Sequence, residues 1–300
     1  MLLTPVEVAL PFREPLFPDN LFGHLVATAV PGVEEWRDGA YRCSLRLPGG
    51  PGVVTLPVPD AGSGVVRARL WLTDPADEAA AVARCRSLLD LDADPAAVGA
   101  VLAADPVLAP LLHAAPGRRV PGTAHPDEFA VRAVLGQQVS TAAARTHAGR
   151  LVQACGDPIQ DPDGGLTHLF PTPDRLAEVD PAVLALPDAR RQAVLRLVRA
   201  LAGGTLDLSP GCDVEQARRA LLALPGIGPW TVETVAMRAL GDRDAFVPTD
   251  LGVRAAAVAL GLPPTPAALV RAARAWQPWR AYAVQYLWAT GTHAVNLLPT

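Results

Sequence analysis

The pattern of apolar and polar positions divides the chain into an extended part and a helical part. Before residue 75, short apolar or alternating runs lie between Pro/Gly turns, which predicts strands at Val6–Val8, Tyr41–Leu47, Gly52–Val58 and Val65–Leu72. One helix is predicted over Asp19–Val30. Antiparallel strands with one helix on a face satisfy this pattern, so residues 1–74 are expected to form an α+β domain.

Residues 75–300 have a helical spacing of apolar positions almost throughout. The predicted helices outside the central stretch described next are Asp77–Leu89, Pro95–Ala103, Pro126–Leu135, Ser140–Ala154, Asp188–Ala202, Pro266–Ala275 and Trp279–Ala289. The segment 156–165 is rich in Pro, Asp and Gly and has no periodicity, so it is predicted to be a loop. The fold class expected from the whole pattern is α+β.

The stretch Leu224–Arg254 stands out because it joins a Gly-rich turn to an isolated carboxylate. The helix before it is expected to begin at Asp213, with Gln216 three residues later in a capping-box spacing. Pro229 suits the first position of the following helix. The sequence therefore predicts a helix, a two-glycine hairpin and a second helix.

Two functions fit this hairpin. Amides around Gly226 and Gly228, with the positive end of the next helix, would bind a phosphate whatever the nucleotide sequence. A tight turn that only connects two helices and binds nothing would have the same glycines. The helical patterns on both sides favour the phosphate clamp.

The second helix of the hairpin has two faces. At 100° per residue, Val232 and Val235 fall on an apolar stripe, whereas Trp230, Thr234 and Met237 fall on the opposite side. A second packing surface explains a lone Trp. The more specific alternative is a binding pocket lined by Trp230 and Trp288. Composition alone does not decide between a packing surface and a pocket.

Asp250 lies at the start of a predicted helix, Leu251–Leu260. Its simplest role is that of an N-cap. The helix dipole and amides would also keep the carboxylate ionised, as a role opposite a developing cation requires. The two roles are compatible.

Composition limits the possible partners. The 300 residues carry a net charge of −4, which argues against a protein that binds nucleic acid over a wide basic surface. A small contact with nucleic acid through backbone amides is still allowed. All 26 basic residues are arginine. Cys43, Cys85, Cys155 and Cys212 have neither metal-ligand nor disulfide spacing. Without a signal peptide or a spanning apolar segment, we expect a cytoplasmic protein with no membrane partner.

Several motifs together resemble the helix-hairpin-helix DNA glycosylases, and most closely the bacterial 3-methyladenine DNA glycosylase II (AlkA-type) family. They are Arg86–Pro95 (RSLLDLDADP), Ala133–Ser140 (AVLGQQVS), Phe170–Pro173 (FPTP), Leu224–Thr231 (LPGIGPWT), Asp244–Gly252 (DAFVPTDLG) and Trp276–Ala283 (WQPWRAYA). The resemblance covers nearly the whole chain. It implies a two-lobed helical glycosylase domain over 75–300, with the helix-hairpin-helix at 213–241.

The resemblance also implies residue roles. Asp250 matches the catalytic aspartate, and Gln138 matches the side chain that fills the gap left by a flipped nucleotide. Other matched positions are base-pocket residues Trp230 and Trp288, phosphate-contacting Gly226, Gly228 and Thr231, and the carbonyls of Leu222, Leu224 and Ile227 at a monovalent-cation site. Thr234 departs from relatives that carry an aromatic ring there, which widens the expected pocket. Phe17 is expected to reach the same base pocket from the N-terminal domain.

The implied activity is that of a monofunctional glycosylase of base excision repair, acting as a monomer on damaged double-stranded DNA without a required cofactor. One carboxylate without a second acid suits alkylated purines, since their positive charge makes the base a good leaving group, and an indole wall attracts such cations by about 0.5–2 kcal/mol. Lesions of this type cost least to flip out of the stack. Bifunctional relatives use a lysine where this chain has Trp230, and besides the amino group of Met1 the chain has no amine. Two alternatives are a glycosylase for oxidised or mismatched bases and a non-catalytic DNA-structure binder.

Overall fold

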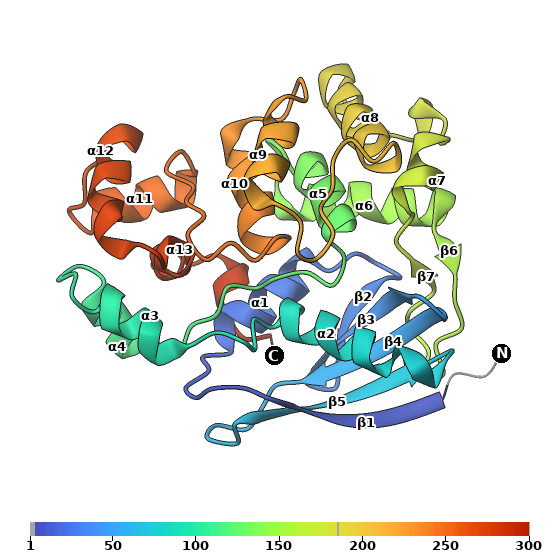
Figure 1. Ribbon diagram of the computed structural model, residues 1–300, viewed down its shortest axis with the longest axis horizontal. Coiled ribbons are helices and arrows are strands. Elements are labelled where there is room, and N and C mark those ends of the chain that lie inside the picture. Colours follow the sequence, from blue (N-terminus) through green and yellow to red (C-terminus); the bar gives the residue numbers. More distant parts are fainter. Residues whose placement is uncertain (1–3, 185, 300) are drawn as a thin grey trace.

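The computed structural model describes residues 4–184 and 186–299, and Met1 lies outside this range. Strands gather in the first quarter of the chain, and helices follow, as predicted (Figure 1). Among the described residues, no helix has both the length and the apolar character needed to cross a membrane.

The N-terminal strands form one antiparallel sheet in the order β1-β5-β4-β3-β2. Their bounds are β1 Thr4–Pro11, β2 Glu34–Arg37, β3 Ala40–Leu47, β4 Gly50–Pro57 and β5 Val65–Leu72. The sequence pattern predicted every strand except β2. This short edge strand has the sequence Glu-Glu-Trp-Arg. Charged side chains protect an edge strand from pairing with another chain. They also replace the alternation of apolar and polar residues by which a strand is predicted.

Two helices contribute to the core of the sheet. Helix α1 (Asp19–Thr28) supplies Leu21, Phe22 and Leu25, as the sequence predicted for a single covering helix. Helix α2 (Glu78–Leu88) also belongs to this core through Ala81, Cys85 and Leu88. Within residues 4–74 the structure has α1 as its α-helix, as predicted, and α2 begins after that range. The sequence did not show that α2 covers the sheet, because its apolar stripe is weak.

The rest of the chain is mostly helical, and most of its helices lie above the sheet in Figure 1. Its α-helices are α3 Pro95–Leu102, α4 Ala109–Ala114, α5 Pro126–Leu135, α6 Thr141–Cys155, α7 Pro173–Ala177, α8 Asp188–Ala202, α9 Val214–Leu222, α10 Pro229–Arg238, α11 Leu251–Ala259, α12 Pro266–Ala272 and α13 Arg280–Trp288. Helices α5 and α8 have the predicted bounds, and the others that were predicted differ by a few residues. The short α4 and α7 were not predicted.

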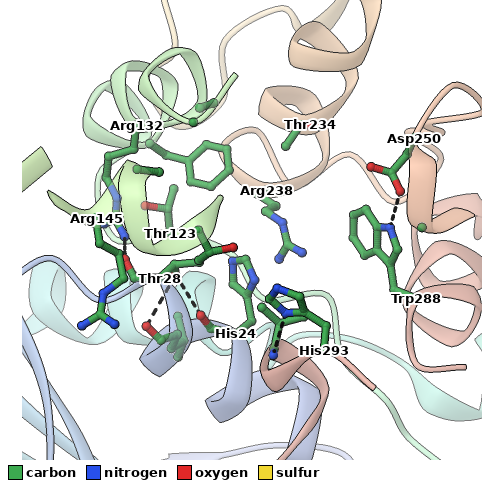
Figure 2. Close-up of a pocket in the computed structure, with 18 of the residues that line it drawn as sticks. His24, Thr28, Thr123, Arg132, Arg145, Thr234, Arg238, Asp250, Trp288 and His293 are labelled. Atoms are coloured by element: carbon green, nitrogen blue, oxygen red, sulfur yellow. Dashed lines mark hydrogen bonds between the residues drawn. The ribbon is translucent and has the colours of Figure 1, made fainter. Parts of the chain in front are cut away.

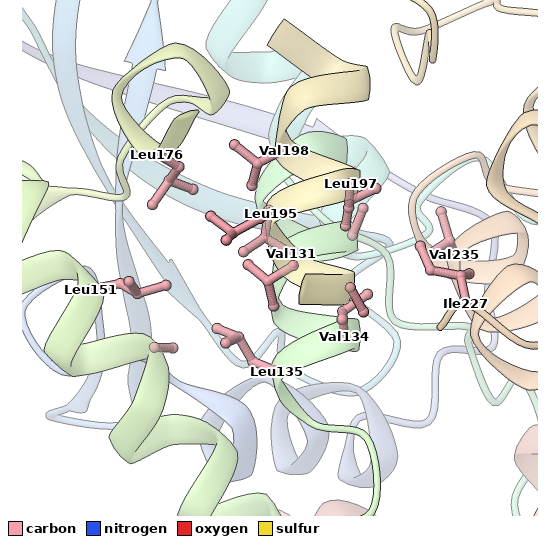
Figure 3. Packing of buried hydrophobic residues seen from close by; sticks show 14 of the residues in the cluster. Val131, Val134, Leu135, Leu151, Leu176, Leu195, Leu197, Val198, Ile227 and Val235 are labelled. Carbon is pink, nitrogen blue, oxygen red and sulfur yellow. The ribbon is translucent and has the colours of Figure 1, made fainter. Parts of the chain in front are cut away.

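Two apolar clusters divide this helical part, and α10 belongs to both. Val232 and Val235 pack into the cluster built around α5, α6 and α8, part of which is drawn in Figure 3. Ala236 and Met237 pack into the cluster built around α11 and α13. Trp230, at the start of α10, is partly buried and packs against the second of these clusters.

The loop predicted over 156–165 contains a short strand. β6 (Asp157–Pro158) pairs with β7 (His168–Leu169), and the loop folds back onto the N-terminal sheet. The Arg42 side chain, almost fully buried, donates to Asp161 Oδ1 at 2.7 Å. Sequence periodicity missed this contact because the two partners lie far apart in the chain.

Candidate functional site

The hairpin between α9 and α10 has the predicted caps. Asp213 accepts the backbone N–H of Gln216 at 3.0 Å, and Pro229 is the first residue of α10. Gly226 has a φ of +95°, and a Cβ on it would lie 2.7 Å from the Ala193 side chain. Gly226 therefore needs to be glycine for two reasons, conformation and close packing against α8.

Gly228 differs from Gly226. Its φ is −98°, so the expected positive φ applies to Gly226 alone. A Cβ on Gly228 would meet nothing within 4 Å. The protein itself leaves this position open, and any need for glycine here comes from a molecule that approaches the N-terminus of α10.

Asp250 caps α11 as the sequence predicted, and it also binds both tryptophans. Its Oδ1 accepts the backbone N–H of Val253 at 2.9 Å and the indole N–H of Trp288 at 2.7 Å (Figure 2). Its Oδ2 accepts the indole N–H of Trp230 at 2.9 Å. Three neutral donors thus fix the half-buried carboxylate, and none of them cancels its charge.

Gly252, a residue without an assigned role, makes room for this arrangement. A Cβ on Gly252 would lie 3.0 Å from Trp288 Cδ1 and 3.2 Å from Asp250 Oδ1. The missing side chain lets the Trp288 ring approach the first turn of α11. The only sequence signal was a glycine two residues after an N-cap.

Thr234 and Arg238 extend the face of α10 that begins with Trp230, since the three residues are spaced four apart. The Thr234 hydroxyl donates to the Trp230 carbonyl at 2.7 Å, so it is already used within the helix. The guanidinium of Arg238 lies 5.4 Å from the centre of the Trp288 ring. The i, i+4, i+8 spacing is the sequence signal that places Arg238 on this face, and the spacing of apolar positions alone does not show it.

The loop between α5 and α6 is tied to the hairpin by Gln137, which the sequence analysis did not single out. Gln137 Nε2 donates to Thr231 Oγ1 at 2.9 Å and to the Gly226 carbonyl at 3.2 Å. Gln138, next to it, is exposed and has a φ of +56°. For a residue other than glycine this conformation costs roughly 1–2 kcal/mol, and the anchored neighbour helps to hold it.

A single cleft of about 1830 Å³ brings most of the predicted site residues together. Its lining includes Gln138, Gly226, Gly228, Trp230, Thr231, Thr234, Asp250 and Trp288. The volume exceeds the roughly 300–1,000 Å³ of ordinary small-molecule pockets, so the cleft suits part of a larger molecule.

Phe17 lies elsewhere. It does not line the cleft, and its ring packs beneath the guanidinium of Arg118, 4.9 Å from ring centre to Cζ. A backbone bridge also joins these two residues. The expected place of Phe17 in the base pocket is therefore not supported, because Arg118 already covers the ring.

The opposite end of the cleft holds a buried ion-pair cluster. Arg132 binds Glu34 at 3.0 Å and Glu128 at 2.8 Å, and it donates to the Thr28 carbonyl. Tyr41 donates to Glu34. Burial raises the pKa of Glu128 to about 7, with the charge of Arg132 opposing the shift and that of Glu34 adding to it.

The cation site expected at the hairpin uses carbonyls that line no part of the cleft. The Leu224 carbonyl accepts the N–H of Ile227 at 3.0 Å, which closes the turn and leaves the oxygen one further lone pair. Leu222, at the end of α9, is exposed. A monovalent cation at these carbonyl oxygens stays a prediction.

Structural and sequence comparisons now define the class of protein. The fold resembles that of a 3-methyladenine DNA-glycosylase from Archaeoglobus fulgidus, with a TM-score of 0.79 and 19% identity over 94% of this chain and 97% of that one. An 8-oxoguanine glycosylase/lyase from Clostridium acetobutylicum also matches, with a TM-score of 0.74 and 16% identity, covering 97% and 99%. The chain thus has the helix-hairpin-helix DNA glycosylase fold, as its motifs predicted.

Sequence relatives narrow the class. A family model for the AlkA N-terminal domain matches residues 7–125. The chain is 36% identical over 273 residues to DNA-3-methyladenine glycosylase 2 of Escherichia coli, covering 90% of this chain and 92% of that protein. It belongs to the AlkA family of DNA-3-methyladenine glycosylases.

A mycobacterial relative is longer. The "Probable bifunctional transcriptional activator/DNA repair enzyme AlkA" of Mycobacterium tuberculosis is 56% identical over 295 residues, 98% of this chain. The chain spans only 59% of that relative's length. The second activity in that name is therefore not transferred to this chain.

Proposed function

We propose that this chain is a monofunctional DNA glycosylase that flips alkylated bases out of double-stranded DNA and hydrolyses their N-glycosidic bond. The observation that carries the proposal is the Asp250 carboxylate, held by three neutral N–H donors in the cleft that the hairpin borders. The family membership, with a relative named DNA-3-methyladenine glycosylase 2, supports the glycosylase part of this proposal.

Cleavage of the bond transfers the electron pair to the base and leaves oxocarbenium character on the sugar. A fixed carboxylate stabilises that cation and orients a water molecule toward C1′. The water oxygen adds to C1′, one water proton stays on the new hydroxyl and the other is transferred, directly or through solvent, to the departing base or to bulk water. The products are the free base and an abasic site.

The phosphate backbone would be bound at the N-terminus of α10. Gly228 is the N-cap of that helix and has free space around its Cα. Amide donors there bind a phosphate without any basic side chain, which agrees with a net charge of −4. The carbonyls of Leu222, Leu224 and Ile227 would bind a monovalent cation next to that phosphate, and exchanging K⁺ for Li⁺ should then weaken DNA binding.

Water is the proposed nucleophile because the chain contains no lysine. Arginine stays protonated and does not form a Schiff base with the sugar. Borohydride added during turnover should therefore trap no protein–DNA adduct, and the product strands should break only on heating with alkali. A covalent band at the combined mass would contradict the monofunctional assignment.

The direct test is to incubate the protein with a duplex treated with a methylating agent and to separate the released bases by chromatography. Free 3-methyladenine and 7-methylguanine are the expected products. A duplex carrying 8-oxoguanine or a mismatch tests the alternative glycosylase, and release from that duplex alone would replace the proposal. Release of no base from any duplex would favour a non-catalytic DNA-structure binder.

A further inference from the structure

Helices α6 and α8 hold a large share of the positive charge of the chain. Residues 141–155 contain two arginines and no carboxylate, and residues 188–202 contain four arginines and a single carboxylate, Asp188. That carboxylate already pairs with Arg191 at 2.5 Å. In a chain with a net charge of −4, these two helices therefore form a local region of excess positive charge.

Three basic side chains of this region, His147, Arg150 and Arg190, form what we call the α6–α8 basic cluster. Burial lowers the pKa of His147, and the charges of Arg150 and Arg190 lower it further, so both guanidiniums lie near the imidazole. Within the described ranges, none of the three side chains forms an ion pair with a carboxylate. Arg150 is exposed, and the other two are partly exposed. Like charges that gather without a counter-charge repel one another, so this surface suits an anionic partner.

Helix α8 carries the cluster close to the hairpin. A Cβ on Gly226 would lie 2.7 Å from the Ala193 side chain, so the helix packs directly against the turn. Arg196, one turn further along α8, donates to the Pro225 carbonyl at 3.2 Å. Arg190 precedes Ala193 by three residues, which is about 5 Å along the helix. The cluster therefore begins about one helical turn from the expected phosphate clamp.

Helix α6 begins beside the same hairpin. Ser140 caps it, two residues after the expected wedge Gln138, and Gln137 ties this loop to the hairpin. His147 and Arg150 follow the cap by about 10 and 15 Å along the helix. A duplex rises about 3.4 Å per base pair, so this distance corresponds to about three or four base pairs.

Figure 1 shows α6 and α8 on the side of α5 that faces away from α11 and α12. Both helices pack on the same apolar core as α5. The basic cluster is therefore held by the lobe that carries the wedge loop, on one flank of the hairpin and away from Asp250. A duplex that lies across the hairpin would pass over this flank with only one of its two arms.

We propose that the α6–α8 basic cluster binds backbone phosphates of the duplex on one side of the lesion, about three or four base pairs from the flipped nucleotide. This inference rests on the DNA-binding part of the proposed function. The hairpin amides hold a phosphate next to the lesion, and the arginines of the cluster hold the flanking arm by charge and by paired N–H donors. Phosphate contacts carry no sequence information, so the cluster acts on damaged and intact duplexes alike.

The test is the salt dependence of binding to a duplex with a neutral tetrahydrofuran abasic site at its centre and a long arm on each side. The double variant Arg150→Gln/Arg190→Gln removes both charges from the helix surfaces and keeps good helix formers there. Each lost phosphate contact should reduce the slope of log affinity against log salt by about 0.9, so the slope should become shallower by roughly 2. Affinity in low salt should fall by roughly tenfold.

The control is the double variant Arg271→Gln/Arg274→Gln, which makes the same change in charge at two exposed positions near α12, in the other lobe. It should keep the wild-type slope. Arg150→Lys/Arg190→Lys keeps both charges and should also keep most of the slope, which separates a contact through charge from an effect on helix packing.

A second measurement uses the wild-type protein alone and so does not depend on the folding of a variant. One arm of the duplex is shortened until it ends next to the abasic site, and then the other arm is shortened instead. Loss of the arm over α6 and α8 should reproduce the shallower slope, and loss of the opposite arm should not. In the double glutamine variant, neither shortening should change the slope further.

A wild-type slope in the double glutamine variant would overturn the role of the cluster while the proposed function stands. A loss of affinity without a change in slope, or equal effects of shortening the two arms, would overturn it as well. If the wild-type protein binds the abasic duplex in this way but releases no methylated base, the proposed glycosylase fails and the cluster stands. If the wild-type protein binds no duplex at all, both fail.

Discussion

The two ends of the cleft hold carboxylates in opposite environments. At one end, Asp250 accepts hydrogen bonds from two indoles and one backbone amide, all of them neutral. At the other end, Glu34 and Glu128 share Arg132, whose charge is used inside the protein to hold these two carboxyl groups. Neutral donors fix a carboxylate and leave its charge for a substrate, whereas an arginine partner uses that charge for stability.

Asp250→Asn should have the largest effect on the function of the two ends of the cleft. Asparagine is nearly isosteric and still caps a helix, so α11 should remain folded. Base release should fall by roughly three orders of magnitude or more, because the developing cation on the sugar loses its counter-charge. Single-turnover release from a 7-methylguanine duplex measures the loss, and circular dichroism checks the fold. Wild-type rates in a folded variant would remove Asp250 from the chemistry.

Arg132→Met should lower stability instead of catalysis. It leaves Glu34 and Glu128 buried without their partner, and breaking a buried pair in this way costs about 3–5 kcal/mol. Urea unfolding measures the loss, with the exposed Arg274→Met as the control. Base release per folded molecule should change little. A stable but inactive Arg132→Met would mean that this end of the cleft takes part in the reaction.

Trp288→Phe should slow base release less than Asp250→Asn does. The ring remains, but Asp250 loses one of its three donors. Hydrogen bonds to charged groups contribute about 1.5–3 kcal/mol, so release should slow roughly ten- to a hundredfold. Trp279→Phe, outside the cleft lining, is the matched control and should keep the wild-type rate. Equal rates for Trp288→Phe and the wild type would mean that Trp230 and Val253 suffice.

Glu128→Gln should produce the smallest effect, visible only as a function of pH. Burial raises the pKa of Glu128 from 4.5 to about 7 in the folded protein. Its contribution to stability is therefore complete below pH 4.5 and is lost as the pH rises through 7. The melting temperature of Glu128→Gln should rise relative to that of the wild type over this interval. The exposed Glu78→Gln should show a constant difference.

Local chemistry made part of this molecule predictable. The caps at Asp213 and Asp250 and the start of α10 at Pro229 follow from residues within four positions of each other. The positive φ of Gly226 likewise follows from the short turn in which it lies. Patterns of this length are fixed by the backbone groups of one turn, so the sequence alone suffices to find them.

Contacts between distant segments were not predictable in the same way. The bonds that join Asp250 to Trp230 and Trp288 span 20 and 38 residues. The packing of α2 on the sheet and the cover of Arg118 over Phe17 likewise depend on how separate elements meet. Periodicity shows that a residue is on a given face of a helix, and only the tertiary structure shows what that face meets.

The most direct test of a catalytic anion at Asp250 is a binding measurement that needs no chemistry. Two duplexes are compared, one with a pyrrolidine that carries a positive charge at the position of C1′ and one with a neutral tetrahydrofuran abasic site. The wild-type protein should bind the cationic duplex roughly tenfold or more tightly than the neutral one, since it mimics the transition state. In Asp250→Asn that preference should disappear while binding to the neutral duplex persists. The same preference in both proteins would contradict the central role of Asp250.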